Sequence, residues 1–191
     1  LMRRLGLTTV FGNPGSTELP FLDRWPEDIR YELCLAEAVA VAMADGHARA
    51  TGRAALCNLH SAVGIGHAMG NLFTAYRNQA PVIVTVGQQA RSLLPGNPFL
   101  GATDAAAFPR PYVKWSVEPA RAEDVPAAIA HAHAIAMQHP RGPVMVSIPM
   151  DDWTRPAAPL APRAHRNDMA PDPQGLAECA AALATAARPV I

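Results

Sequence analysis

Residues 8–18 read TTVFGNPGSTE, the most informative stretch of the chain. The apolar run 8–12 predicts a strand, the turn Asn13-Pro14-Gly15-Ser16 ends it, and a helix is expected to begin at Glu18. A strand that runs through a tight turn into a helix places backbone N–H groups and small side chains at the carboxyl end of a sheet. Open α/β folds bind their ligands at that end, so the stretch indicates a binding site.

Outward from this stretch, strands and helices alternate along the chain. The all-apolar run 81–86 is typical of the centre of a parallel sheet. The expected strands are 8–12, 29–33, 54–59, 81–86, 113–115 and 144–148, and the expected helices are 18–24, 37–51, 63–77 and 122–138. Alternation of this kind implies right-handed crossovers, so we expect an α/β fold with three αβα layers and one mostly parallel sheet.

The chain changes character near residue 155. Residues 1–155 form the expected domain, and the proline-rich stretch 156–173 reads as a linker. Residues 174–191 are expected to begin a second, central domain with an Ala-rich helix over 172–187 and a strand that is cut off at Ile191. We therefore expect the 191 residues to be a piece of a longer polypeptide.

Composition excludes several classes of function. Lys plus Arg and Asp plus Glu both number 16, so there is no basic surface for nucleic acid. No apolar stretch is long enough to span a membrane. The three cysteines, Cys34, Cys57 and Cys179, are odd in number and lack metal-binding spacing, which indicates reduced thiols and a cytoplasmic protein.

Two titratable residues follow further expected strands. Glu37 opens the helix 37–51 between apolar neighbours. It is either an exposed first-turn acid that complements the helix dipole, or a shielded carboxyl that donates a hydrogen bond to a ring nitrogen. His60 ends the strand 54–59 and is either a structural histidine or a proton donor and acceptor at the strand ends. The glycines that follow His60 match a dinucleotide loop only weakly.

Taken together, the segments of residues 5–153 resemble the amino-terminal, pyrimidine-binding domain of thiamine-diphosphate-dependent 2-oxoacid decarboxylases, and most closely those that decarboxylate benzoylformate. The resemblance depends on the order and spacing of several short motifs. They are Phe11-Gly12-Asn13-Pro14-Gly15-Ser16, Leu35-Ala36-Glu37-Ala38, Asn58-Leu59-His60-Ser61-Ala62, Pro81-Val82-Ile83-Val84, Phe108-Pro109-Arg110-Pro111, Val113-Lys114-Trp115 and Gly142-Pro143-Val144.

The resemblance implies roles for particular residues. Glu37 matches the glutamate that hydrogen-bonds the pyrimidine ring of the cofactor and so promotes loss of the thiazolium proton. His60 matches a histidine that transfers protons, and Ser16 matches a serine that contacts the substrate carboxylate. The turn Asn13, Pro14 and Gly15 would border the cofactor, as would His67, which stands where the nearest relatives are expected to carry Asn.

The resemblance also separates substrates. Phe99-Leu100 stands where pyruvate decarboxylases carry a His-His pair, and either residue would line an apolar substrate pocket. With His60, this pair favours an aromatic 2-oxoacid such as benzoylformate over pyruvate. Two alternatives stay open: a carboligating enzyme similar to acetolactate synthase, and a non-catalytic binding module with the same fold.

The cofactors implied are thiamine diphosphate and Mg²⁺, but the chain has no Gly-Asp-Gly motif. We therefore expect no metal ligands here, and place the ligands of the metal and the diphosphate in a carboxyl-terminal part. In the family the cofactor lies between two subunits. The resemblance thus implies a homo-oligomer, a dimer of dimers in the full-length protein, and an inactive fragment whose exposed apolar face seeks a partner.

Overall fold

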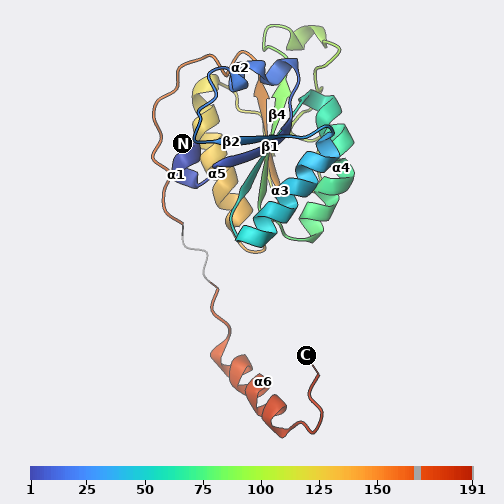
Figure 1. Cartoon of the computed structure of the whole chain (residues 1–191), viewed down its shortest axis with the longest axis vertical. Coiled ribbons are helices and arrows are strands. Elements are labelled where there is room, and N and C mark those ends of the chain that lie inside the picture. Colours follow the sequence, from blue (N-terminus) through green and yellow to red (C-terminus); the bar gives the residue numbers. More distant parts are fainter. Residues whose placement is uncertain (166–168, 191) are drawn as a thin grey trace.

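The computed structural model describes residues 1–165 and 169–190, and Figure 1 shows the whole arrangement. The strands of these described residues form one sheet, with helices on both of its faces. The strands are β1 (Thr9–Asn13), β2 (Arg30–Leu33), β3 (Ala55–Leu59), β4 (Val82–Gln88), β5 (Ser116–Val117) and β6 (Val144–Pro149). The helices are α1 (Met2–Leu5), α2 (Leu19–Leu22), α3 (Glu37–Thr51), α4 (Ser61–Arg77), α5 (Val125–Met137) and α6 (Pro173–Thr185), with short 3-10 turns at Ser16–Glu18, Leu94–Gly96 and Ala122–Asp124.

The sheet has the order β2-β1-β3-β4-β6-β5, and every pair of neighbouring strands is parallel. After β1 the chain moves outward to β2, whereas after β3 it moves the other way to β4. The crevice between β1 and β3 is therefore a topological switch point, where open α/β sheets place their ligands. The predicted α/β class and three-layer arrangement are confirmed.

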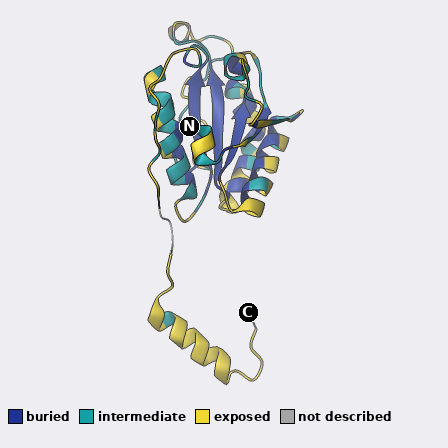
Figure 2. Cartoon of the chain, turned by 60° about the vertical axis from the view of Figure 1, so that its left-hand side comes forward, coloured by how far each residue is buried: buried dark blue, intermediate teal, exposed yellow. Residues whose placement is uncertain are grey.

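Side chains that alternate along each strand build a separate core on each face of the sheet. On one face, Cys57 and Val84 pack with buried residues of α3 and α4. On the other face, Leu56 and Ile83 pack with Ile129 and other residues of α5. Figure 2 shows the strands buried between helices that are each buried on the side facing the sheet. Parallel strands covered on both faces read as continuous apolar runs, which explains why they could be recognised in the sequence.

Glycine ends α3 as the sequence predicts. Gly52 has a φ of 67°, in the left-handed region that favours glycine at the end of a helix. Gly6 ends α1 in the same way, with a φ of 72°. Helix α4 begins at Ser61, two residues before the expected position, so it follows β3 with only His60 between them. That short connection brings the start of α4 to the strand ends.

The edge of the sheet differs from the prediction. The expected strand at 113–115 is wrong: β5 covers Ser116–Val117 and pairs with Met145 and Val146 of β6. Residues 113–115 lead into it, because Lys114 N–H donates to Pro143 O at 2.8 Å and Trp115 O accepts from Met145 N–H at 3.0 Å. Val113 made the stretch look like a strand, but its side chain is buried in the core.

Helix α6 lies apart from the sheet (Figure 1). It buries none of its residues. Residues 186–190 form no strand, and Ile191 and residues 166–168 of the expected linker lie outside the described residues. Cys34, Cys57 and Cys179 are all free thiols, as predicted. Among the described helices, none has the length and apolar character needed to cross a membrane.

Candidate functional site

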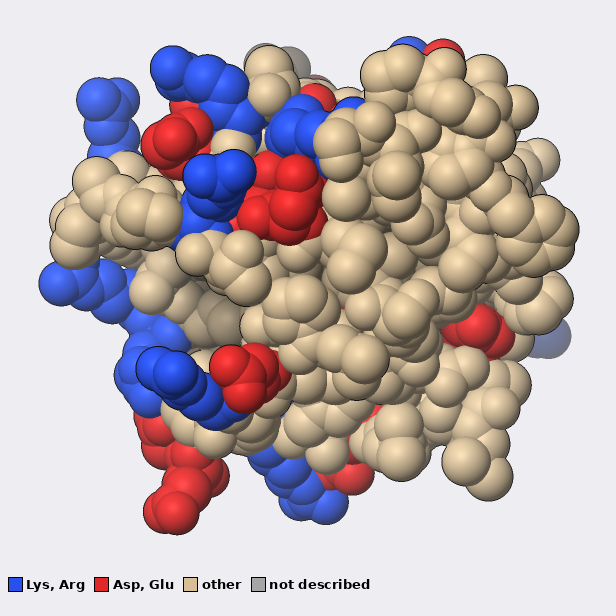
Figure 3. All heavy atoms as spheres, turned by 90° about the horizontal axis from the view of Figure 1, so that it is seen from above, with Lys and Arg blue, Asp and Glu red and all other residues tan. Residues whose placement is uncertain are grey.

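The candidate site lies where β1, β2 and β3 end. The turn after β1 carries Gly15, Thr17 and Glu18, the segment after β2 leads to Glu37, and β3 leads directly to His60. Figure 3 looks down on this end of the molecule, the top of Figure 1, and shows charged side chains gathered on one side and few on the other.

A buried carboxyl organises the turn after β1. The Glu18 side chain has no exposed surface, yet no Lys or Arg of the described residues pairs with it. Its carboxyl accepts from Gly15 N–H at 2.7 Å and from the Thr17 hydroxyl at 2.5 Å, and its Oε2 lies 3.0 Å from Nδ1 of His60. These contacts replace the water that a buried carboxylate loses.

The same contacts orient His60. Nδ1 also lies 3.0 Å from the Thr17 hydroxyl, so both partners hold one ring nitrogen. An acceptor at Glu18 Oε2 requires Nδ1 to be the donor, which leaves Nε2 for a ligand. The His60 side chain is 19% exposed. His60 is thus held from behind by a buried carboxyl, with one nitrogen available in front.

Two glycines leave the space that the side chains of Glu18, Thr17 and His60 occupy. A Cβ atom at Gly15 would overlap the His60 ring, and a Cβ atom at Gly87, near the end of β4, would overlap Glu18 and Thr17. Glycine is therefore required sterically at both positions. Because Gly87 sits in a central strand, Glu18 reaches across the carboxyl ends of the sheet.

Glu37 begins α3 and is buried, with 9% of the residue exposed. Gly64 of α4 faces it: a Cβ atom there would lie 3.4 Å from Glu37 Cγ and 3.5 Å from Oε1. Gly64 N–H in turn donates to the carbonyl oxygen of His60. Glu37 and His60 are therefore bridged by the first turn of α4. The carboxyl of Glu37 is therefore shielded from water and also lies in the first turn of α3, while its role toward a ligand stays a prediction.

The start of α4 is strained. Ser61 has a φ of 37°, in the left-handed region, although it is not glycine. Its side chain is fully buried, and its hydroxyl oxygen has no hydrogen-bond partner within the described parts of the chain. Backbone strain and an unpaired buried polar group both cost free energy, and they cluster at functional sites.

The remaining predicted residues divide into two groups. Asn13, Pro14 and Gly15 lie half-buried in the turn beside His60, Ser16 is exposed there, and Nδ1 of His67 lies 3.3 Å from Oε2 of Glu37. The structure brings these residues to one end of the sheet. Their roles toward a ligand stay predictions.

Phe99 and Leu100 are not brought into this group. Phe99 is 99% exposed, so the other described residues bury almost none of it. A cavity of about 510 Å³ opens beside it, lined by Pro98, Gly101 and Glu118 among others, and includes neither Phe99 nor Leu100. Among the described residues, the two side chains therefore stand outside this cavity.

Sequence patterns did not indicate a role at the site for Glu18, Thr17 or Gly87. Glu18 looked like an ordinary acid in the first turn of a helix. The signal that could have found it is Gly87, a glycine close to the end of an otherwise apolar central strand, which indicates a close approach by another group.

The arrangement can hold a small heteroaromatic ligand and move protons. A shielded carboxyl and an oriented imidazole at one strand-end crevice provide acid–base groups on two sides of a ligand. Residues 1–165 and 169–190 contain no cluster of three His, Cys, Asp or Glu side chains placed to hold a metal ion.

Comparison with known proteins gives a consistent result. Residues 1–108 match the family described as thiamine pyrophosphate enzyme, N-terminal TPP binding domain. The chain is 49% identical to a benzoylformate decarboxylase of Pseudomonas aeruginosa over all of its length and 37% of that protein. It is 35% identical to the acetolactate synthase large subunit of Haemophilus influenzae, over 78% of the chain and 26% of that subunit.

A solved structure is similar along the whole chain. The thiamine diphosphate-dependent 4-hydroxybenzoylformate decarboxylase of Rhodococcus jostii RHA1 superposes with a TM-score of 0.91 and 45% sequence identity, covering 100% of this chain and 37% of that one. The chain thus spans less than half the length of these relatives.

Proposed function

Because the chain belongs to the thiamine pyrophosphate enzymes, as their N-terminal TPP binding domain, we propose that it is part of a carboxy-lyase acting on an aromatic 2-oxoacid. The reaction is the non-oxidative decarboxylation of benzoylformate to benzaldehyde and carbon dioxide. The observation that carries the proposal is the shielded carboxyl of Glu37 at the head of α3, bridged by α4 to the oriented His60.

The site fits the pyrimidine half of thiamine diphosphate. Glu37 presents a carboxyl shielded from water, Gly64 leaves room beside it, and Oε1 accepts no hydrogen bond from the described residues. Glu37 would hydrogen-bond a ring nitrogen, and a dry carboxyl shares a proton with such a nitrogen better than an exposed one does. When bound, the thiazolium ring of the cofactor supplies the electron sink for loss of carbon dioxide.

Residues on the other side of the crevice would bind the substrate and transfer protons to or from it. His60 offers Nε2 as a proton donor or acceptor, and Glu18 and Thr17 keep its ring in one orientation. Ser16, which is exposed beside it, would contact the substrate carboxylate. Asn13, Pro14 and Gly15 would border the cofactor.

The rest of the site would come from outside the described residues. We propose that Mg²⁺ and the diphosphate are held by a carboxyl-terminal domain, that residues 1–155 are the pyrimidine-binding domain, and that 156–173 and 174–191 are a linker and the start of a central domain. Phe99 and Leu100 would become a substrate wall when another domain or subunit covers them, since the described residues leave Phe99 almost fully exposed.

An exposed apolar surface supports a homo-oligomer. Large apolar side chains are exposed at the end of β2, on the segment between β2 and α3, and on α3 and α4; they are Leu33, Leu35, Val39, Met43, Val63 and Phe73. Such a surface, which we call the α3–α4 face, marks a protein–protein contact. We propose that two copies meet there, in a dimer of dimers that places each Glu37 near a second subunit. A cytoplasmic enzyme of mandelate degradation would fit this assignment.

A second candidate is an enzyme similar to acetolactate synthase, favoured by the 35% identity to the Haemophilus influenzae subunit over 78% of the chain. The higher identity to the benzoylformate decarboxylase, 49% over the whole chain, favours the first. A non-catalytic module of the same fold is the remaining alternative.

Substrate profiling of the full-length protein tests the proposal. Purified protein with thiamine diphosphate and Mg²⁺ would be given benzoylformate, 4-hydroxybenzoylformate or pyruvate, and carbon dioxide, aldehyde and acetolactate would be measured. We expect the aromatic acids to be turned over with a kcat/KM at least about tenfold above that of pyruvate. Preference for pyruvate would contradict the substrate, acetolactate as product would favour the second candidate, and no turnover would favour the module.

A further inference from the structure

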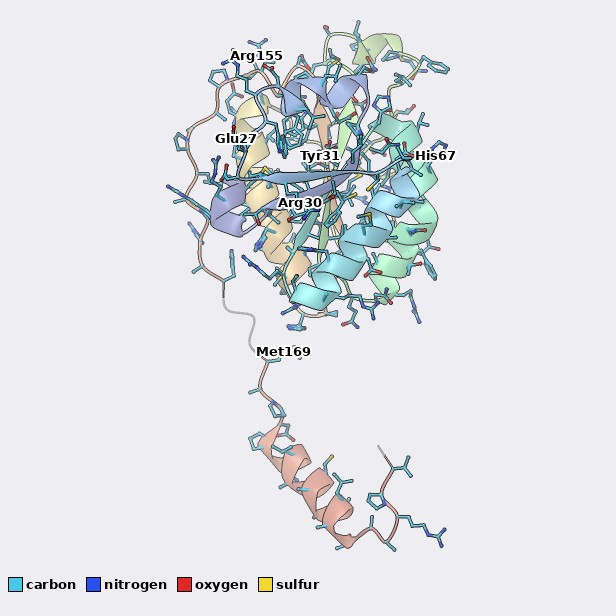
Figure 4. All side chains as sticks on the ribbon, viewed as in Figure 1. Glu27, Arg30, Tyr31, His67, Arg155 and Met169 are labelled. Carbon is cyan, nitrogen blue, oxygen red and sulfur yellow. The ribbon has the colours of Figure 1, made fainter. Side chains whose placement is uncertain are left out.

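His67 is an exposed residue whose side chain contacts the shielded carboxyl of Glu37. His67 lies on α4, three residues after Gly64, so the two residues lie on the same face of the helix. Its Nδ1 lies 3.3 Å from Oε2 of Glu37, and no other hydrogen bond of its side chain is found in the described parts of the chain. Figure 4 shows His67 on α4, near the amino-terminal end of α3.

Two residues of α4 thus fix the carboxyl of Glu37 from one side. Gly64 lies against Cγ and Oε1 without a side chain, which leaves space for the carboxyl. His67 contacts Oε2. With Glu37 ionised, Nδ1–H donates to Oε2, and this hydrogen bond limits rotation of the carboxyl group. Oε1 is then the oxygen left for a ring nitrogen.

The exposure of the two partners distinguishes this contact from core packing. The Glu37 side chain is 12% exposed, whereas the His67 side chain is 67% exposed. An exposed side chain contributes little apolar burial, so its removal costs the fold little. The contact therefore has a small structural role and a direct geometric effect on the shielded carboxyl.

We propose that His67 is a positioning residue for Glu37: it ties Oε2 to α4 so that Oε1 faces the pyrimidine ring of the cofactor. This rests on the proposed function. His67 acts through Glu37 and transfers no proton to the substrate. The hydrogen-bond donor is the essential part of its side chain, and the rest of the imidazole ring is not.

Variants of the full-length enzyme separate the donor from the ring. In Asn the amide nitrogen stands as many bonds from Cα as Nδ1 does in His, so His67→Asn keeps a donor at the same place. His67→Leu keeps comparable volume and removes the donor. The control is His131→Leu on α5, where an exposed histidine is removed far from Glu37.

The measurement is the dissociation constant of thiamine diphosphate at saturating Mg²⁺, by titration calorimetry without substrate, with the melting temperature of each cofactor-free variant alongside. We expect His67→Leu to weaken binding about tenfold, the effect of one hydrogen bond to a charged group. His67→Asn and His131→Leu should stay within about threefold of the unaltered enzyme. Melting temperatures should stay unchanged.

Three results would overturn the inference. Equal affinities for His67→Leu and the unaltered enzyme would show that the contact orients nothing. An equal loss in the Asn and Leu variants would show that the donor is not the essential part. A large fall in melting temperature for His67→Leu alone would show a structural role. If the unaltered enzyme bound no thiamine diphosphate, the proposed function itself would fail, which is a distinct outcome.

Discussion

At the scale of single residues, the site depends on two carboxyls that are kept from water in different ways. Glu18 is fully buried and surrounded by donors from Gly15, Thr17 and His60. Glu37 is nearly buried but keeps one oxygen without a partner among the described residues. The first carboxyl is satisfied and therefore structural, while the second is ready to bind a ligand.

Replacement of Glu18 by Gln should damage both fold and activity. An amide offers only one acceptor oxygen, so either the Thr17 hydroxyl or the pair Gly15 N–H and His60 Nδ1–H would lose its acceptor. An unsatisfied buried donor costs about 1–3 kcal/mol. We expect a lower melting temperature of the full-length protein and a lower kcat, since His60 loses its fixed orientation.

The matched control is Glu27→Gln, which alters an exposed glutamate (Figure 4) and should leave stability within about 0.5 kcal/mol. Thermal unfolding and decarboxylation rates give both readouts. Equal stability of the two variants would show that the Glu18 cluster contributes nothing to the fold.

The burial of a side chain could be predicted where the residues next to it in the sequence indicate it. The apolar flanks of Glu37 allowed a shielded carboxyl, and the structure confirms it. Glu18 could not be found in this way, because its burial depends on Gly87, which is distant in the sequence and near in space. Local patterns do not report such tertiary contacts.

At the scale of helices and strands, glycines set how closely the elements approach. Gly87→Ala should destabilise the protein, because its Cβ atom would overlap Glu18 and Thr17 and force the turn after β1 to move. Overpacking of this kind costs about 1–3 kcal/mol. Loss of His60 orientation, and hence of activity, should accompany it.

Gly46→Ala is the control for Gly87→Ala, because it makes the same substitution at a position without close neighbours. Gly46 is exposed on α3 with open space around the missing Cβ atom. Alanine is favoured over glycine inside a helix by about 1 kcal/mol, so this variant should melt at a higher temperature. A Gly87→Ala variant as stable as the unaltered protein would contradict the packing described at the strand ends.

Thiol reactivity tests the burial of β3 and of the segment before α3. Burial raises the pKa of the Cys57 thiol well above its usual range, and burial also raises the pKa of Cys34. The thiolate is the reactive form, so a raised pKa leaves less of it at neutral pH. We expect neither cysteine to be alkylated by iodoacetamide at pH 7.5 in the folded full-length protein.

Mass spectrometry of peptides from folded and urea-unfolded samples measures this directly. Both cysteines should be labelled only after unfolding. Rapid labelling of Cys57 in the folded protein would show that β3 opens far more easily than its complete burial implies.

The bounds of a helix or strand could be predicted where its own sequence determines where it begins and ends. Helix α3 has the bounds expected from the Ala-rich run and its terminal Gly52. The edge strand β5 was misplaced, because a two-residue strand carries no periodic pattern and its position depends on pairing with β6.

At the scale of the whole molecule, the chain presents a site that is open on one side and an apolar face next to it. Leu35, which precedes α3, is 94% exposed, and Glu37 lies two residues further on. The α3–α4 face and the shielded carboxyl are therefore neighbours, and a partner that covers one also affects the other.

Leu35→Lys should weaken association of the full-length protein and its affinity for thiamine diphosphate together. A charge placed in an apolar contact loses its hydration without a partner. Ala50→Lys, at the exposed far end of α3, is the control and should do neither. Analytical ultracentrifugation and cofactor titration measure the two effects, and an unchanged oligomer in Leu35→Lys would contradict the α3–α4 face as the contact.

Activation of bound thiamine diphosphate by Glu37 is the step on which the proposed function depends. The most direct measurement is the rate at which the proton on the thiazolium carbon exchanges with deuterium, by quenched-flow NMR, in the full-length enzyme and in Glu37→Gln. We expect exchange to slow by about 10²–10⁴-fold in the variant, the usual contribution of acid–base catalysis, while the fold persists by circular dichroism. Equal exchange rates in the two proteins would contradict the claim.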